Sequence, residues 1–223
     1  MIGAGITGHT VAITAREWLN GETFVLGCGR PVGFGFQPGQ YVTIGYGGEE
    51  REYTLISSPA APELRFLIKR VEDGRLSGAL AGLALGARLR LSGAKGYLTW
   101  QTTDRPAVFV ANGVGIAPFV AMAAAGIAGF TLIQGARTPS GLFFRHELSR
   151  AAGRYVPCLS GTPVRHLALA DVHHGRVTDY IERHLVPGVY DFYLCGSRSM
   201  ITDVTLLLDR LCPDARIYSE AYT

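Results

Sequence analysis

The amino-acid sequence predicts two domains of different class: a six-stranded antiparallel β-barrel, followed by a doubly wound α/β domain with a parallel sheet. Two observations support this prediction. Up to about residue 100 of 223, short apolar or β-branched runs are separated by Gly and Pro clusters, whereas from Pro106 onward buried strands alternate with Gly-rich turns and helical segments. The change falls near residues 102–105, so we expect the domains to cover residues 1–103 and 104–223.

Six short strands and one helix account for the predicted barrel. Apolar and polar residues alternate clearly along Arg88–Leu91, as expected for a strand with one buried face. The helix is expected over Ser77–Leu83, with Ser77 as its N-cap. The strands are expected at Thr10–Ala15, Thr23–Leu26, Gln40–Tyr46, Tyr53–Ile56, Leu64–Arg70 and Arg88–Leu91.

Strand and helix alternate through the second domain, which implies a parallel sheet covered by helices on both faces. The strands are expected at Ala107–Ala111, Phe130–Gln134, Tyr155–Leu159, Asp191–Cys195 and Arg216–Ser219. The helices are expected at Ala117–Ala125, Leu142–Ala152, Val177–His184 and Met200–Leu211.

Composition argues against several classes of function. The net charge is +3, without runs of basic residues, so nucleic-acid binding is not expected. The four cysteines are too scattered for a zinc or iron–sulfur site, and we expect no metal. We find no secretory leader and no apolar run of membrane-spanning length, so we expect a cytoplasmic protein without a membrane span.

The segment Gly3–Gly8 matches the G-x-G-x-x-G dinucleotide-binding pattern. Only Met1 and Ile2 precede it, and a strand-like run follows it, whereas the motif requires a strand before the turn and a helix after it. We therefore interpret it as a lead-in segment.

Two segments of the barrel suit a flat, phosphorylated ligand. In Arg51-Glu52-Tyr53-Thr54, a guanidinium can clamp a phosphate, a ring can stack on a heterocycle and a hydroxyl can reach a ring nitrogen. Strand geometry places Arg51 and Tyr53 on one face and Thr54 on the other. The segment Lys69–Ser77 leads into a helix whose N-terminus could hold a pyrophosphate. A surface strand and an ordinary N-cap are the alternatives.

Two turns of the second domain join a strand to a helix. In Asn112–Pro118, Gly113 and Gly115 allow the backbone to approach a diphosphate. In Tyr193–Met200, Cys195 lies where a substrate ring would dock. A turn without a ligand and a cysteine of the core are the alternatives.

Together these motifs resemble the ferredoxin-NADP reductase family. The resemblance implies a flavin-binding barrel followed by a nicotinamide-nucleotide-binding domain. It runs through Phe36-Gln37-Pro38-Gly39-Gln40-Tyr41, Arg51-x-Tyr53-Thr54, Gly74-x-x-Ser77, Gly93-x-x-Gly96-x-Leu98, Gly113–Pro118, Cys195-Gly196-x-x-x-Met200 and Glu220-Ala221-Tyr222, in the family's order.

The resemblance also implies roles for barrel residues. Arg51 would clamp the pyrophosphate of FAD, Tyr53 would stack on the isoalloxazine, and Thr54 would hydrogen-bond near N5. Tyr222 would correspond to the aromatic residue that covers the other flavin face, although Thr223 follows it. Further FAD contacts would come from Lys69, Val71, Gly74, Leu76 and Ser77.

In the second domain, the resemblance implies that Cys195 lines the hydride path and that Glu220 relays a proton or tunes the redox potential. With Thr54, these are the candidate catalytic residues. The nicotinamide nucleotide would be held by Gly113, Val114, Gly115, Pro118, Gly196 and Met200.

Arg137 and Arg176 match positions that can hold the 2'-phosphate of NADP(H), with solvated surface charge as the alternative. Val114 replaces a common hydroxyl residue, and Gly161 stands where NADP-preferring relatives often have a basic residue. Because no acidic residue stands at Ser160, we expect NADP(H), with NAD(H) possible.

The implied enzyme takes a hydride from NADPH onto FAD and passes single electrons to a separate ferredoxin or flavodoxin. Positive charge for docking an acidic carrier would come from Lys69, Arg70, Arg75 and Lys95. Three alternatives stay open: the reductase component of an oxygenase system, an NAD(P)H:flavin reductase, and a flavin relay subunit without nucleotide activity.

Overall fold

The computed structural model describes residues 8–161 and 172–222. Contacts between Cα atoms divide the chain into two compact units, Met1–Trp100 with Ala117–Ala125 and Gln101–Ile116 with Gly126–Thr223. The domain boundary expected between residues 103 and 104 stays a prediction. Most of the Gly3–Gly8 segment lies outside the described residues, and the strand expected after it is present.

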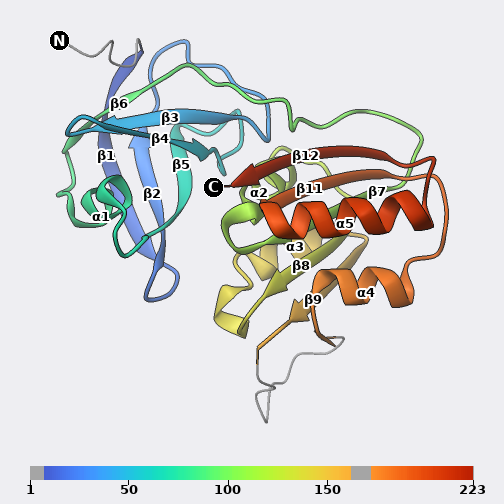
Figure 1. The fold of residues 1–223 in the computed structure, drawn as a ribbon. Coiled ribbons are helices and arrows are strands. Elements are labelled where there is room, and N and C mark those ends of the chain that lie inside the picture. Colours follow the sequence, from blue (N-terminus) through green and yellow to red (C-terminus); the bar gives the residue numbers. More distant parts are fainter. Residues whose placement is uncertain (1–7, 162–171, 223) are drawn as a thin grey trace. The chain divides into compact units, whose positions relative to one another are not determined.

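The first unit contains a six-stranded antiparallel sheet with the strand order β4-β3-β6-β1-β2-β5 (Figure 1). Beyond the end of β4, Leu55 forms a bridge with Phe66 of β5, which brings the two edge strands together. The sheet is therefore nearly closed, and the predicted barrel is confirmed. Its strands are β1 (His9–Trp18), β2 (Thr23–Gly29), β3 (Tyr41–Tyr46), β4 (Glu49–Thr54), β5 (Glu63–Lys69) and β6 (Arg88–Leu91).

The long strand β1 belongs to both halves of this sheet. Its residues 9–12 pair with β6, its residues 13–18 pair with β2, and the β2 register shifts between Ile13 and Ala15. Such an irregularity bends a strand, which helps the sheet to curl around its core. Phe24 and Phe66 are fully buried in that core, and helix α1 (Arg75–Gly82) packs Leu80 into it.

The second unit contains a six-stranded parallel sheet with the order β10-β9-β8-β7-β11-β12. The chain runs outward from β7 to β10 and then returns to the other side of β7, so the strand order reverses between β7 and β11. Ligands bind at the carboxyl ends of the strands beside such a reversal. The predicted doubly wound fold is confirmed. Its strands are β7 (Ala107–Asn112), β8 (Thr131–Ala136), β9 (Arg154–Leu159), β10 (His173–His174), β11 (Asp191–Ser197) and β12 (Arg216–Tyr222).

Helices α4 (Val177–His184) and α5 (Arg198–Leu211) lie on the same face of the sheet (Figure 1). Their buried side chains form one apolar cluster with those of the strands. Val108 and Val110 of β7 point into this cluster, whereas Phe109 lies on the other face, where it stacks on Phe130 and meets Tyr193 edge-on. The remaining helical elements of the described chain are η1 (Gly113–Ile116), α2 (Ala117–Ala124, grouped with the first unit), η2 (Pro139–Gly141) and α3 (Arg145–Ala151).

Helix α1 begins earlier than expected, and the prediction that Ser77 is its N-cap is wrong. Gly74 is the N-cap, and Ser77 lies in the first turn, where its Oγ accepts a hydrogen bond from the Val71 N–H at 3.1 Å. A Cβ at residue 74 would lie 2.6 Å from Ser77 Oγ. Only glycine therefore allows the chain to turn this tightly into the helix.

Strand β4 also begins earlier than the expected Tyr53. Gly47 and Gly48, both with positive φ (60° and 85°), form the turn between β3 and β4, and pairing starts directly at Glu49. The charged run Glu49–Glu52 hid this strand from an argument based on apolar residues.

Two helices differ from their predicted bounds. Residues 142–144 precede α3 because Phe144 has a left-handed conformation (φ 56°) and the buried Gln134 side chain donates a hydrogen bond to the Phe143 carbonyl. Helix α5 starts at Arg198, because Ser197 caps it by accepting a hydrogen bond from the Met200 N–H. The two-residue strand β10 was not predicted.

Candidate functional site

The candidate flavin residues of the first unit lie on β4. Arg51 is opposite Ile44 of β3, and Tyr53 is opposite Val42, so both share the face of these two core residues. Thr54 is buried on the other face, as the alternation predicts. Burial raises the pKa of Tyr53 to about 12, and the nearby Arg51 guanidinium opposes this shift. The Tyr53 phenol thus stays neutral, and its ring is available for stacking.

The N-terminus of α1 lies beside β4. Arg75, its first residue, forms an ion pair with Glu49, the first residue of β4, at 3.2 Å. The backbone N–H groups of the first helical turn have no partner within the helix, and they carry the positive end of the helix dipole. Arg51 and these N–H groups therefore lie on adjoining elements, in an arrangement that suits a pyrophosphate.

Of the other residues predicted to contact FAD, some offer only their backbone, and one has a side chain that is bound elsewhere. The Leu76 side chain is buried in the core, so only its backbone can reach a ligand. The Lys69 ammonium pairs with Glu22 at 3.2 Å, at the turn that joins β1 and β2. The exposed Val71 offers its backbone, whose N–H already binds Ser77.

The same contacts bear on the predicted docking charges. Lys69 and Arg75 are paired with carboxylates, and the Arg70 guanidinium lies over the Trp18 ring, 5.5 Å from its centroid. Lys95 is exposed. Because neighbouring carboxylates offset the charges of Lys69 and Arg75, these four residues present less net positive charge than their number suggests.

In the second unit, the turn after β7 is pressed against the end of β11. A Cβ on Gly115 would lie 2.3 Å from the Cys195 carbonyl oxygen and 2.5 Å from Gly196 Cα. Gly113 has a positive φ of 55°, and a Cβ there would meet open space. One glycine thus permits close packing of two backbones, and the other leaves an open side on which a diphosphate can approach.

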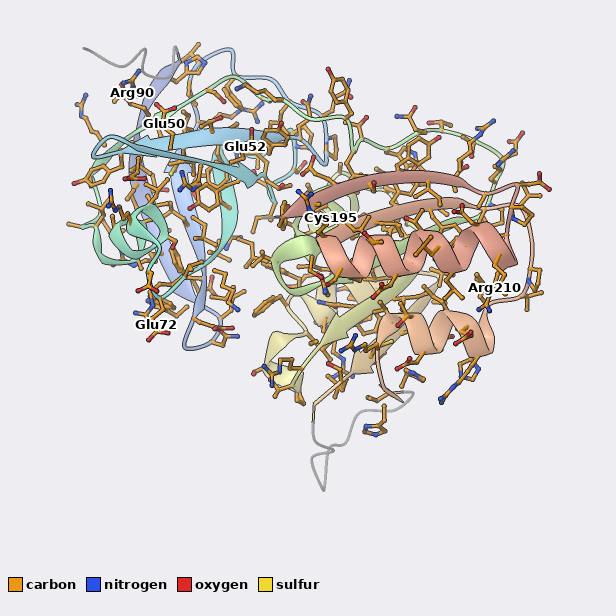
Figure 2. The ribbon with its side chains drawn as sticks, viewed as in Figure 1. Glu50, Glu52, Glu72, Arg90, Cys195 and Arg210 are labelled. Atoms are coloured by element: carbon orange, nitrogen blue, oxygen red, sulfur yellow. The ribbon has the colours of Figure 1, made fainter. Side chains whose placement is uncertain are left out.

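Cys195, Glu220 and Tyr222 come together on one face of the sheet. Cys195 is in register with Glu220 of β12, and Figure 2 shows Cys195 near the carboxyl end of β11. Burial raises the pKa of Cys195 most, and the Glu220 carboxylate raises it further. A hydrogen bond from the Tyr222 side chain and one from the Gly196 backbone oppose this rise. The thiol is therefore neutral and suits packing against a ring rather than nucleophilic attack.

Arg137 and Arg176 are both exposed at the carboxyl edge of the sheet. Arg137 follows β8, and its carbonyl accepts a hydrogen bond from the Gly161 N–H at 3.0 Å, which ties the Ser160 turn to it. Arg176 precedes α4, and its N–H donates to Asp179 Oδ2 at 2.8 Å. Val177 lies against Gly135 of β8, so the start of α4 is close to the end of β8. Both residues therefore stand at the same edge of the sheet, with exposed side chains.

Three further predicted residues contribute through packing. The side chains of Pro118 and Met200 are buried, and Met200 belongs to the core beneath α5. Val114 is half-buried within η1. Only the backbone of these residues is suited to nucleotide phosphates.

Sequence reasoning assigned no role to Asn112 and Ser197. The Asn112 side chain, at the end of β7, bonds Ser197, at the end of β11. The position of Asn112, directly before a Gly-rich turn, could have marked it as a candidate site residue. Its partner Ser197, however, lies 85 residues further along the chain. No pattern in the sequence indicates that pair.

No helix in residues 8–161 and 172–222 is long and apolar enough to cross a membrane. Over the same residues, no group of three or more His, Cys, Asp or Glu side chains is placed to hold a metal ion.

The chain matches two family descriptions, "Oxidoreductase FAD-binding domain" over residues 15–100 and "Oxidoreductase NAD-binding domain" over residues 109–205. Among curated relatives, the toluate 1,2-dioxygenase electron transfer component of Pseudomonas putida is 32% identical over 179 residues, which are 76% of this chain and 53% of that protein. The chain spans about half the length of the curated relatives it matches.

Solved structures share the fold of the whole chain. A cytochrome P450 reductase of Amycolatopsis matches with a TM-score of 0.80 at 26% identity, over 100% of this chain and 73% of that chain. A ferredoxin NADP+ reductase from Neisseria gonorrhoeae with bound FAD and NADP matches with a TM-score of 0.80 at 20% identity, over 95% of this chain and 98% of that chain.

Proposed function

Because this chain belongs to the ferredoxin-NADP reductase-like family of FAD- and NAD(P)-binding flavoenzyme oxidoreductases, we propose that it takes a hydride from NADPH onto FAD and passes the electrons singly to a separate ferredoxin or flavodoxin. The observation that carries this proposal is the presence, in one chain, of both binding arrangements: β4, which carries Arg51 and is joined to the start of α1 by the Glu49–Arg75 ion pair, and the Gly113–Gly115 turn against Cys195.

Residues of the first unit fit FAD. Arg51 and the N–H groups of the first turn of α1 hold the pyrophosphate, and the close approach at Gly74 shapes that turn. The neutral ring of Tyr53 stacks on the isoalloxazine, and Thr54 follows it at the end of β4, with its side chain buried on the opposite face. When bound, FAD accepts two electrons with a hydride and releases them one at a time.

Residues of the second unit fit the nicotinamide nucleotide. The Gly113–Ile116 turn receives its diphosphate, and the fully buried Cys195, on whose carbonyl Gly115 packs, supports this turn without competing as a nucleophile. Glu220, in register with Cys195, holds a proton or a negative charge at the same edge of the sheet. The protein's contribution to the reaction is therefore orientation, exclusion of water and electrostatic tuning.

The direct test is an anaerobic stopped-flow experiment on the FAD-loaded protein, mixed separately with NADPH and with NADH. We expect rapid loss of flavin absorbance with NADPH, and reduction of ferredoxin or flavodoxin when the carrier is added. A flavin that neither nucleotide reduces would indicate a relay subunit, and a protein that cannot bind FAD would overturn the proposal.

Nucleotide preference is tested at the two arginines. Replacing Arg137 or Arg176 with Ala should raise the KM for NADPH by about tenfold or more and leave that for NADH within about twofold, because each side chain loses a charge-assisted bond to the 2'-phosphate. Arg150, an exposed arginine in the last turn of α3, is the matched control. An equal rise for NADPH and NADH would contradict the assignment.

A second candidate is the electron-transfer component of an oxygenase system. It is favoured by the 32% identity to the toluate 1,2-dioxygenase component and by the 26% identity to the cytochrome P450 reductase. The two candidates share the steps up to reduced FAD and differ in the acceptor. Rates measured with ferredoxin, flavodoxin, an oxygenase component and free flavin under identical conditions separate them, and faster reduction of free flavin than of any protein would overturn both.

A further inference from the structure

The ends of β7 and β11 are joined by a side chain where their backbone pairing stops. The register between the two strands runs from Asp191 opposite Ala107 to Cys195 opposite Ala111, and it ends there. Immediately beyond, Asn112 Oδ1 accepts a hydrogen bond from the Ser197 N–H at 2.8 Å, and Asn112 Nδ2 donates one to Ser197 Oγ at 3.0 Å. The carboxamide thus continues the link between the strands after the ladder has ended.

Close packing shows that this link has little freedom. Gly196 has φ 146°, and a Cβ there would lie 2.0 Å from Asn112 Oδ1. On the next turn, Gly115 leaves no room for a Cβ beside Cys195 and Gly196. The amide of Asn112 therefore lies directly on the Gly196 backbone, and the turns that follow β7 and β11 are packed against each other.

The link extends into α5. Ser197 Oγ, which receives the Asn112 bond, also accepts the N–H of Met200 at 3.3 Å and lies 3.3 Å from Ser199 Oγ. Asn112 thereby fixes both the end of β11 and the first turn of α5. A neutral carboxamide suits this position, because it offers an acceptor and a donor at once without adding negative charge beside a diphosphate.

We propose that Asn112 is a positioning residue for the nicotinamide nucleotide: its bonds to Ser197 set the spacing between the Gly113–Ile116 turn and the Cys195–Ser199 turn, and so the orientation of the nicotinamide ring. This inference rests on the proposed function, in which these two turns hold the nucleotide. The ladder between β7 and β11 ends at the carboxyl edge, where ligands bind in such sheets, and the Asn112 side chain continues the link beyond it.

The test compares Asn112→Ala, Ser197→Ala and their double variant with the wild type, as FAD-loaded full-length protein. Titration calorimetry gives the Kd for NADP+ and for 2'-AMP, which lacks the nicotinamide end, and stopped flow gives the limiting rate of flavin reduction by NADPH. For Asn112→Ala we expect a Kd for NADP+ raised by about tenfold, a limiting rate lowered by about tenfold, and a Kd for 2'-AMP within about twofold of the wild type.

The double variant separates positioning from helix capping. If the bond between the two side chains matters, Ser197→Ala should change the limiting rate less in the Asn112→Ala background than in the wild type. Ser197→Thr, which retains a hydroxyl, should restore most of the rate. Asn20→Ala is the matched control, because Asn20 Oδ1 accepts the N–H groups of Glu22 and Thr23 in a turn of the first unit. It should leave nucleotide binding unchanged.

Each outcome decides the inference. If the wild type binds NADP+ and the Asn112→Ala variant has the same Kd and rate, the proposed function stands and the role of Asn112 is overturned. Equal weakening of NADP+ and 2'-AMP indicates local unfolding and also overturns it. A wild-type protein that binds neither NADP+ nor NAD+ removes the proposed function together with this inference. If Asn112→Ala does not fold, the comparison of Ser197→Ala with Ser197→Thr decides, and equal Kd values and rates overturn the proposal.

Discussion

At the scale of single residues, two glycines leave no room for a Cβ: Gly115 lies against backbone, and Gly196, which has a positive φ, lies against a side chain. Gly115 has no room for a Cβ beside the Cys195 carbonyl, and Gly196 has none beside Asn112. The Gly115 clash involves backbone atoms and cannot be relieved by a rotamer change, so the end of β11 itself must move. These glycines therefore determine how closely the two turns of the candidate nucleotide site approach each other.

Gly115→Ala should lower the free energy of unfolding by about 1–3 kcal/mol and weaken NADP+ binding by about tenfold or more, because the β11 end is pushed away from η1. Gly78→Ala is the matched control: a Cβ on this residue of α1 meets nothing within 4 Å. It should raise the unfolding free energy by about 0.5–1 kcal/mol. Denaturant unfolding and calorimetry measure both, and a Gly115→Ala protein with wild-type affinity would contradict the packing argument.

At the scale of elements, the start of α3 depends on one buried polar side chain. Gln134 of β8 is fully buried; its Nε2 donates to the Phe143 carbonyl at 3.1 Å, and its Oε1 accepts the Tyr155 hydroxyl at 2.7 Å. These bonds satisfy the carbonyl that precedes the left-handed Phe144, so a central strand controls where the neighbouring helix begins.

Gln134→Leu should lower the free energy of unfolding by about 2–4 kcal/mol, since it leaves a carbonyl and a hydroxyl unpaired in the interior. Tyr155→Phe removes only one of the two bonds and should cost about 1 kcal/mol. Urea titration of both variants gives the comparison. Equal costs would show that the Phe143 bond contributes nothing.

The contact between β10 and α4 should make stability depend on pH. Burial makes the largest contribution to lowering the pKa of His173, and the nearby His184 and Arg183 lower it further. Asp179 opposes this shift, and His174 adds a smaller lowering effect. Below the ordinary histidine pKa of about 6.5, the unfolded chain therefore binds a proton that the folded chain resists, and stability falls as the pH falls toward the folded pKa.

His173→Phe should therefore show a smaller drop in Tm between pH 7.5 and pH 5.5 than the wild type. The substitution retains a ring near Tyr180 and His184, whose centroids lie 5.4 and 6.0 Å from that of His173. His146→Gln, at an exposed position of α3, serves as the control and should leave the drop unchanged. An identical drop in His173→Phe would exclude His173 as its source.

At the scale of the whole molecule, each unit has a hydrophobic core of its own and presents a separate arrangement for a ligand. A ligand that binds only the folded state stabilises the elements it contacts. The proposed function therefore predicts that the two ligands protect different parts of the chain from hydrogen exchange.

Adding FAD to the apoprotein should slow amide exchange in β4 and α1, whereas adding NADP+ should slow it in η1, at the end of β11 and in the first turn of α5. The turn between β1 and β2, remote in the sequence from both sets, is the internal control. Exchange measured by mass spectrometry with each ligand alone tests this, and NADP+ protection confined to β4 and α1 would contradict the assignment.

Much of the fold was predictable because it depends on local pattern. Period-two alternation marked Arg88–Leu91, and the strand–turn–helix rhythm marked the parallel sheet. The errors occurred where a distant group decides: pairing with β3 extends β4 to Glu49, and the Gln134 bond holds the residues before α3 out of the helix. The Ser77 error has a local cause, since the hydroxyl folds back onto Val71 instead of capping the helix.

By itself, the sequence determined the class of both halves, the order of their elements and the motifs of the family, because periodicity and turn glycines act between near neighbours in the chain. Only the tertiary structure decided which of these motifs meet. Asn112 reaches Ser197, and Cys195 lies beside Glu220, because parallel strands from distant parts of the chain stand in one register. Register follows from packing the sheet as a whole, and no local pattern encodes it.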